Sequence, residues 1–463
     1  MKYKIMKCPF ETKQEEFNII ISLRTSEKFN LTNRSNTNLQ CGAKCINASV
    51  TINSEIELTD EVIWLSKNTL EELLIPENIE ICVQTIGHGD VIKFGPIIGI
   101  LTESFIIKGH KKGRPIREDF NCFAEAGSKI GGLIYIFSLN KVDFGNKRIM
   151  GYVPLINESM KIKWQDQWLP IPDAIHNRLK ISRSSSLYKK VNDISELVPA
   201  FNIINRTTKI YKWRIQKFLE QDSYAKKYLP KTVLFKGSNT LAKMLQEFPF
   251  IYLKPVGRSL GLGIIKISKD GTDEYTAKYR EKGILYSLSG NLMELLPKLK
   301  MLMGKRTYIV QEGIPLAAYN GNIFDIRVSV QKDETGTWSI SRWKIRVAAP
   351  NSIVTNLSAG GTTGNTNQLM DSVFKEDAAK ISNDINTACL AICNAIEKKT
   401  SGIGDIGLDI GITKGRKIYF IEANFREHRF ISGSDEDIES LENTIKKPIY
   451  YLNYLYKKKL QNN

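Results

Sequence analysis

The sequence is most informative at residues 407–424, which read Gly407-Leu-Asp409-Ile-Gly-Ile-Thr413-Lys-Gly-Arg-Lys-Ile-Tyr-Phe-Ile-Glu422-Ala-Asn424. Two apolar runs flank a Lys-Gly pair, a pattern that predicts a β-hairpin. If Thr413 faces Arg416, Asp409 lies opposite Phe420, and residues that oppose each other or alternate along a strand share a face. Asp409, Glu422 and Asn424 then converge as oxygen donors suited to magnesium. An edge hairpin with polar residues turned outward would show the same pattern.

A glycine-rich loop lies between two predicted strands in residues 252–267. Gly257, Gly261 and Gly263 would let backbone N–H groups approach phosphate oxygens, and Lys254 supplies a positive charge just before them. The spacing fits neither a Walker A loop nor a dinucleotide-binding GxGxxG motif. The segment therefore predicts either a loop that covers phosphates or the ordinary turn of a hairpin.

A third hairpin is predicted between two strands that carry arginines. Pairing Lys332 with Thr337 places Arg327 opposite Arg342 and leaves Arg346 on the same face. Arginines on one face of a hairpin repel one another, so an anion bound between them would be favoured. Solvated arginines on an outer face are the alternative.

The composition is that of a folded, multidomain globular chain. The 463 residues are 42% hydrophobic and 25% charged, and the longest apolar runs, at 94–101 and 130–139, are too short to cross a membrane. The net charge of +17 reflects a Lys-rich bias along the whole chain, so we do not expect nucleic acid as a partner. Seven scattered cysteines and no apolar leader indicate reduced thiols in the cytoplasm.

The pattern of strands and helices predicts an α+β chain of three domains. Residues 1–93 alternate short strands with polar turns, which indicates a β-rich domain. Residues 94–190 alternate strands with helices, which indicates a parallel sheet. Residues 191–463 mix both, and the glycine loop together with a long insertion at 270–305 suggests a mobile lid at about 231–308.

The informative segments occur in the order found in ATP-grasp enzymes, and the chain resembles the YheC/YheD family of ATP-grasp proteins from endospore-forming bacteria. The resemblance covers about residues 94–429. Its motifs are Phe94-Gly-Pro, Leu229-Pro-Lys231-Thr, Lys254-Pro with Gly263-Ile, Gln311-Glu312-Gly-Ile314, Phe324-Asp-Ile-Arg327, Asn356 to Gly361, Gly407-Leu-Asp409-Ile and Ile421-Glu422-Ala-Asn424. After Asn424 the chain continues Phe425-Arg426-Glu427-His428, where the family usually has a small residue and a Pro-Gly pair.

The resemblance implies the fold and the roles of the site residues. The fold would be two α+β subdomains that grip ATP, preceded by a βα domain and the β-rich domain. ATP would be bound by Lys231, Lys254, Gly257, Ser259, Gly261, Gly263, Gln311, Glu312 and Ile314. Magnesium would be held by Asp409, Glu422 and Asn424, and the reacting groups would face Arg327, Arg346 and Asn356.

The reaction implied is ATP-dependent ligation. A carboxylate of an amino acid, a peptide or a peptide-like acceptor would become an acyl phosphate, which an amine or a similar nucleophile then attacks. Two alternatives remain open: a phosphotransferase, and a nucleotide-binding scaffold without turnover. The resemblance adds an association with the endospore coat to the expected cytoplasmic location.

Overall fold

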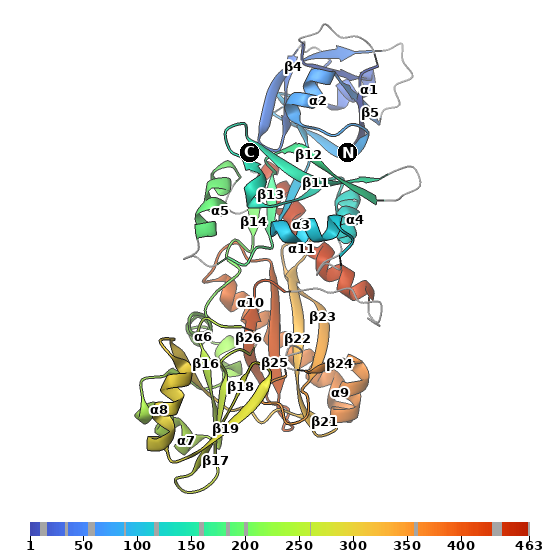
Figure 1. Ribbon diagram of the computed structural model, residues 1–463. Helices are drawn as coiled ribbons and strands as arrows, with labels where there is room; N and C mark the ends of the chain where they lie inside the picture. The colour runs from blue at the N-terminus through green and yellow to red at the C-terminus, as the bar shows by residue number, and fades with distance from the viewer. Residues whose placement is uncertain are drawn as a thin grey trace.

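The computed structural model describes residues 1–9, 16–32, 36–53, 61–87, 89–114, 120–156, 162–181, 186–198, 202–259, 261–355, 360–427 and 438–461. Its strands form a barrel and three open sheets, which follow one another along the chain. In Figure 1 the barrel lies at one end of an elongated molecule and the last two sheets lie at the other. No described helix is both long and apolar enough to cross a membrane.

The first strands close into a barrel in the order β1-β5-β2-β4-β3-β7-β6. Alternate residues point inward, such as Tyr3 and Ile5 in β1, and this gives the period of two expected for strands buried on one face. The segment is therefore β-rich, as predicted. Its elements are β1 (Lys2–Lys7), β2 (Asn18–Ile21), α1 (Leu23–Lys28), β3 (Asn36–Cys41), β4 (Lys44–Ile52), β5 (Val62–Leu65), α2 (Lys67–Leu73), β6 (Ile79–Ile86) and β7 (Val91–Phe94).

The second sheet has the order β10-β11-β9-β8-β13-β14, with β12 paired to β11. Its strands β9, β8, β13 and β14 are parallel, and β8 and β9 are buried throughout because helices cover them. Its elements are β8 (Ile97–Leu101), α3 (Ser104–Lys111), α4 (Phe120–Ile130), β9 (Leu133–Phe137), β10 (Val142–Asp143), β11 (Arg148–Ile156), β12 (Ile162–Pro170), β13 (Ala174–Asn177), α5 (Ser186–Leu197) and β14 (Ile203–Ile204).

The third sheet is antiparallel, in the order β15-β20-β16-β17-β18-β19, and follows α6 (Lys212–Glu220). The helices α7 and α8 share a separate apolar core with it. Its elements are β15 (Thr232–Leu234), α7 (Ser238–Glu247), β16 (Phe250–Pro255), β17 (Ile265–Lys269), β18 (Tyr275–Glu281), β19 (Ile284–Gly290), α8 (Leu292–Met303) and β20 (Tyr308–Glu312).

The fourth sheet is also antiparallel, in the order β24-β23-β22-β25-β26, with β21 paired to β22. The apolar face of α10 packs on it. Its elements are β21 (Ala318–Tyr319), β22 (Asn322–Lys332), β23 (Trp338–Val347), β24 (Thr362–Gly364), α9 (Thr366–Phe374), α10 (Ala378–Glu397), β25 (Asp405–Ile412) and β26 (Ile418–Asn424).

The last helix, α11 (Ile438–Gln461), joins the parts of the molecule. Ile445, Ile449 and Leu452 are buried in the core of the second sheet, and α11 also contacts β22 and β23. Near the end of the helix, Gln84 of the barrel donates a hydrogen bond to the Tyr456 hydroxyl at 3.0 Å. The second sheet is thereby fixed against the fourth, next to the residues described below.

Candidate active site

Two adjoining cavities lie where the third and fourth sheets meet. The larger one, of 440 Å³, is lined by the start of α6, the β16–β17 loop and strands β22, β23, β25 and β26. The smaller one, of 80 Å³, has mainly apolar walls. The two share the side chains of Lys212, Lys254, Arg258, Gln311, Asp409, Ile421 and Glu422. Charged groups from both sheets therefore meet at their junction.

The β25–β26 hairpin brings the three predicted oxygen donors together in a register different from the expected one. Thr413 pairs with Lys417 across a three-residue turn in which Arg416 has a φ of +66°, and a bulge follows between Asp409 and Ile410. Asp409 consequently lies directly opposite Glu422 rather than Phe420. The prediction missed both the longer turn and the bulge.

Arginines surround the buried carboxylate of Asp409. Arg327 donates a hydrogen bond to it, and Arg346 lies 3.2 Å away while also holding Asp325 through two hydrogen bonds of 2.7 and 2.6 Å. Burial alone would raise the pKa of Asp409, but the two guanidinium groups outweigh burial and lower it. For Asp325 burial dominates, so that its pKa is raised. Asp409 is thus held ionised by cations that line the larger cavity.

The β22–β23 hairpin also differs from its predicted register. Lys332 pairs with Trp338, and a bulge between Ser329 and Val330 places Arg327 opposite Lys344 instead of Arg342. All three arginines nevertheless line the larger cavity. They do so because the turn and the bulge each shift the pairing by one residue, and the total shift of two keeps Arg327 on the same face as Arg342 and Arg346.

The donor set fits magnesium. Among the described residues no group of three or more His, Cys, Asp or Glu side chains could hold a metal ion. Asp409, Glu422 and Asn424 instead combine two carboxylates with one amide, and all three line the larger cavity. The buried Nδ2 of Asn424 has no hydrogen-bond partner in the described part of the chain. Since the oxygen and nitrogen ends of an amide are assigned from their surroundings, the oxygen of Asn424 is available as a metal ligand.

Two lysines, Lys254 and Lys212, lie at the junction of the cavities, and only Lys254 was predicted from the sequence. Lys254 donates to Gln311 at 2.5 Å, and burial lowers the pKa of Lys254 to about 8. Lys212, the first residue of α6, donates to Glu422 at 2.9 Å and to the Arg258 carbonyl. Lys231, which we expected here, lines neither cavity and pairs with Glu247 on the surface. No signal in the sequence marked Lys212, because lysines are frequent along the whole chain.

The glycine loop lies over the cavities. Gly257 and Ser259 line the larger cavity and Gly261 lines the smaller one. Gly261 has a φ of +71° and Gly263 a φ of +76°, values that favour glycine. Gly263 lines neither cavity, and its carbonyl accepts a hydrogen bond from the Tyr308 hydroxyl at 3.1 Å. Gly263 therefore shapes the turn of the loop without lining a cavity.

The end of β20 forms part of the wall of the smaller cavity. Gln311, Glu312 and Ile314 line it, together with apolar side chains that include Leu316 and Ile353. The Glu312 carboxylate accepts a hydrogen bond from the backbone N–H of Lys231 at 2.9 Å. Asn356 falls outside the residues that the structure describes.

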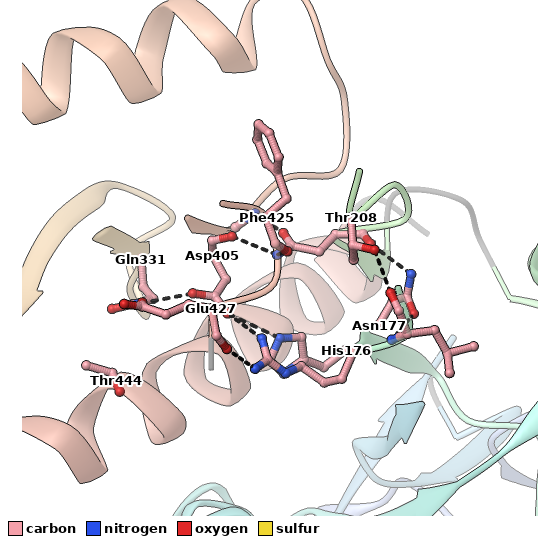
Figure 2. Close-up of polar contacts among 12 residues, drawn as sticks. His176, Asn177, Thr208, Gln331, Asp405, Phe425, Glu427 and Thr444 are labelled. Carbon is pink, nitrogen blue, oxygen red and sulfur yellow. Dashed lines mark hydrogen bonds and ion pairs between the residues drawn. The ribbon is translucent and has the colours of Figure 1, made fainter. Parts of the chain in front are cut away.

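A buried polar network joins the second sheet to the site (Figure 2). Arg178, which follows β13, lies 3.2 Å from Asp405 at the start of β25 and donates to the Glu427 carbonyl. Asn205 donates to the carbonyls of Asp405 and Phe425 at 2.7 and 2.8 Å. The chain directly after Asn424 is therefore held by residues of the second sheet and its neighbouring loop.

Two antiparallel sheets that enclose a cavity, with a glycine-rich loop on one and carboxylates on the other, are the arrangement of an ATP-grasp protein. A family model described as YheC/D like ATP-grasp matches residues 200–455, more than half of the chain. The chain therefore belongs to the YheC/D-like ATP-grasp family, and the expected α+β fold is confirmed.

The chain is also similar to two curated relatives and to two solved structures. The endospore coat-associated protein YheD of Bacillus subtilis is 25% identical over 429 residues, which cover 90% of both chains. YheC of the same species, also named endospore coat-associated, is 22% identical over 277 residues, 59% of this chain and 76% of that protein. D-alanyl-alanine synthetase A from Vibrio cholerae has a TM-score of 0.46 at 10% identity, covering 80% of this chain and 99% of its own. The VanG D-Ala:D-Ser ligase from Enterococcus faecalis has a TM-score of 0.44 at 14% identity, covering 78% and 99%.

Proposed function

We propose that this chain is an ATP-dependent ligase that activates a carboxylate as an acyl phosphate and joins it to an amine or a similar nucleophile. The observation that carries the proposal is the junction of the two cavities. There the cations Lys212 and Lys254, which suit phosphate, meet the oxygen donors Asp409 and Glu422. They lie between the smaller, mainly apolar cavity (the slot) and the larger cavity with its many charged side chains (the chamber). A nucleotide can occupy the slot while a second substrate occupies the chamber.

ATP would bind with its base in the smaller cavity. Ile314 and Leu316 offer apolar contacts to the ring, and the end of β20 offers backbone groups to its polar edge. The triphosphate would then extend toward Lys212, Lys254 and the glycine loop, where the charges are complementary. Lys231 has no role in this arrangement.

Asp409, Glu422 and Asn424 would hold magnesium, which supplies charge neutralisation at the phosphates when bound. Arg327 would remain beside Asp409 and face the transferring phosphoryl group, as would Arg346. These guanidinium groups are fixed by buried carboxylates, so they stabilise developing charge without having to reorganise. We keep Asn356 as a proposed further contact.

In the first step a carboxylate oxygen of the acceptor attacks the γ-phosphorus of ATP, the bond to the β–γ bridging oxygen breaks, and ADP leaves. An acceptor carboxylate is already ionised at neutral pH, so this step needs no general base. In the second step the amine nitrogen attacks the acyl carbon, the carbon–oxygen bond to phosphate breaks, and phosphate leaves while the nitrogen loses a proton to solvent. The protein positions both substrates and excludes water.

The test uses an acceptor whose carboxylate is labelled with ¹⁸O. Amino acids and short peptides are supplied in pairs with ATP and magnesium, and ADP, phosphate and the coupled product are measured. A ligase transfers one ¹⁸O atom from the acceptor to free phosphate. Phosphate that stays on the acceptor would establish a phosphotransferase instead, and no turnover with any pair while ATP binds would favour the scaffold.

A matched pair of variants accompanies this test. Glu422→Gln removes a proposed metal ligand without changing size and is expected to lower turnover about a hundredfold. Glu80→Gln removes an exposed carboxylate of the barrel and is expected to have no effect. Equal activity in both variants would refute the assignment of Glu422.

The location is proposed from the substrate and from the relatives. We propose a cytoplasmic protein, since ATP is supplied there, that associates with the endospore coat as the names of its relatives indicate. Recovery of the protein only in the soluble fraction of sporulating cells would argue against the coat association.

A further inference from the structure

The larger cavity contains basic side chains that the proposed ligase steps do not use. They line the larger cavity and not the smaller one, and we call them the distal basic cluster: Lys180, Lys209, Arg342, Lys344 and Arg426. They come from four separate parts of the fold, namely the chain after β13, the segment before α6, strand β23 and the chain after β26. Such convergence on one chamber is a property of the tertiary structure and not of a local basic run.

The position of the cluster relates it to the acceptor and not to the nucleotide. The smaller cavity, proposed to take the base, reaches the larger one through Lys212, Lys254, Asp409 and Glu422. None of the distal basic cluster lines that shared part. The cluster therefore lies in the remaining part of the chamber, where a second substrate would be bound.

The charge of the chamber is strongly one-sided. Of the described residues that line it, ten are basic and three are acidic, namely Asp409, Glu422 and Glu427. Arg426 pairs with Glu103, the residue before α3, at 2.7 Å. Lys344 lies directly opposite Arg327 across β22 and β23, so both strands present cations to the same chamber. This excess of cations over carboxylates favours an anionic ligand in the chamber.

We propose that the distal basic cluster binds an acceptor that carries at least two negative charges besides the carboxylate that becomes phosphorylated. This inference rests on the proposed ligase function and narrows its substrate class. The guanidinium fork of Arg342 suits a carboxylate or a phosphate, and Lys180, Lys209 and Lys344 add point charges around it. A polycarboxylate and a phosphorylated carboxylic acid share this chemistry.

The experiment measures binding to the full chain by calorimetry, with and without a non-hydrolysable ATP analogue and magnesium. One arm compares triglutamate with trialanine, and the other compares phosphoserine with serine. At least one anion is expected to bind about tenfold or more tightly than its counterpart without net charge, trialanine or serine. The arm that shows the preference identifies the source of the charge.

Variants connect the preference to the cluster. Arg342→Gln combined with Lys344→Gln is expected to remove about tenfold of the anion affinity, whereas Lys163→Gln on the exposed edge of β12 is expected to leave it unchanged. The proposal is wrong if neither triglutamate nor phosphoserine binds better than its counterpart without net charge. It is also wrong if the double variant still prefers the anion as strongly as the parent does. Failure of the ATP analogue to bind counts instead against the ligase, because the anion arms are also run without nucleotide.

Discussion

At the scale of single residues, Lys254 is a cation of the site whose charge depends on pH just above neutrality. Burial lowers the pKa of Lys254 to about 8, while Glu422 and Asp409 partly restore it. Triphosphate oxygens beside the ammonium group would raise this pKa further, because an opposite charge favours the protonated form. Binding of ATP should therefore take up a proton above pH 8.

The first prediction concerns the affinity for ATP between pH 7 and 9.5. Since the free protein loses the Lys254 proton above about pH 8 and the complex keeps it, the affinity should fall by up to about tenfold per pH unit above pH 8. Lys254→Arg should bind with little pH dependence, because a guanidinium group stays protonated in this range. Calorimetry at several pH values checks both. Identical pH profiles for the two proteins would remove Lys254 from the phosphate site.

The second prediction separates Lys212 from Lys231. Lys212→Ala should weaken ATP binding about tenfold or more, because the ammonium group lies at the junction of the cavities. Lys231→Ala should change it little, because that residue forms only a surface pair with Glu247, whose side chain is 47% exposed. Equal losses of ATP affinity in the two variants would show that the Lys231–Glu247 pair exists only without ATP and that Lys231 moves into the site when ATP binds.

At the scale of elements, two bulges and one loop build the site. The bulge in β25–β26 places Asp409 directly opposite Glu422, and the bulge in β22–β23 places Lys344 opposite Arg327. The β16–β17 loop extends from the third sheet over both cavities. Because the third sheet has its own core, it can move as a unit that carries the loop.

The third prediction is that the third sheet closes over bound nucleotide. Peptides covering residues 256–264 should exchange their amide hydrogens more slowly when a non-hydrolysable ATP analogue and magnesium are bound, because closure orders the loop around the phosphates. Peptides from β1 and β6 of the barrel serve as the internal control and should not respond. If calorimetry shows that the analogue binds and the loop peptides exchange at an unchanged rate, both the lid and the phosphate role of the loop have to be abandoned.

At the scale of the whole molecule, the second sheet is part of the site's support. The barrel and the second sheet share one continuous core, and α11 fixes this unit against β22 and β23. Within the junction, Arg178 and Asp405 are both buried and form an ion pair between the second and fourth sheets (Figure 2). The same arginine holds the Glu427 carbonyl beside the chamber.

The fourth prediction concerns this pair. Arg178→Met should lower the free energy of unfolding by about 3–5 kcal/mol, because it leaves the Asp405 carboxylate buried without its main cation. Arg148→Met breaks a half-exposed pair with Asp143 and should cost at most about 1 kcal/mol. Urea denaturation measures both. Asp405→Asn added to Arg178→Met should recover part of the loss, and a similar small effect in both single variants would contradict the proposed coupling of the sheets.

The sequence by itself determined the local elements and the chemical type of the site. The apolar runs of β8 and β9 and the hairpins around Asp409 and Arg327 are local patterns, and they were predicted at the correct places although the register of both hairpins was wrong. In both hairpins the true pairing at the site differs from the predicted one by two residues, and an even shift keeps the same side chains on one face.

Only the tertiary structure decided which cations meet the carboxylates. The opposition of Asp409 and Glu422 depends on the three-residue Lys-Gly-Arg turn and on the bulge between Asp409 and Ile410, and neither has a distinct signal in the sequence. Lys212 and Lys231 are both lysines near apolar segments, and the packing of α6 against the β16–β17 loop brings one of them to the site while β15 leaves the other outside. Convergence of distant segments follows from how elements pack, and a single chain's local patterns do not contain that information.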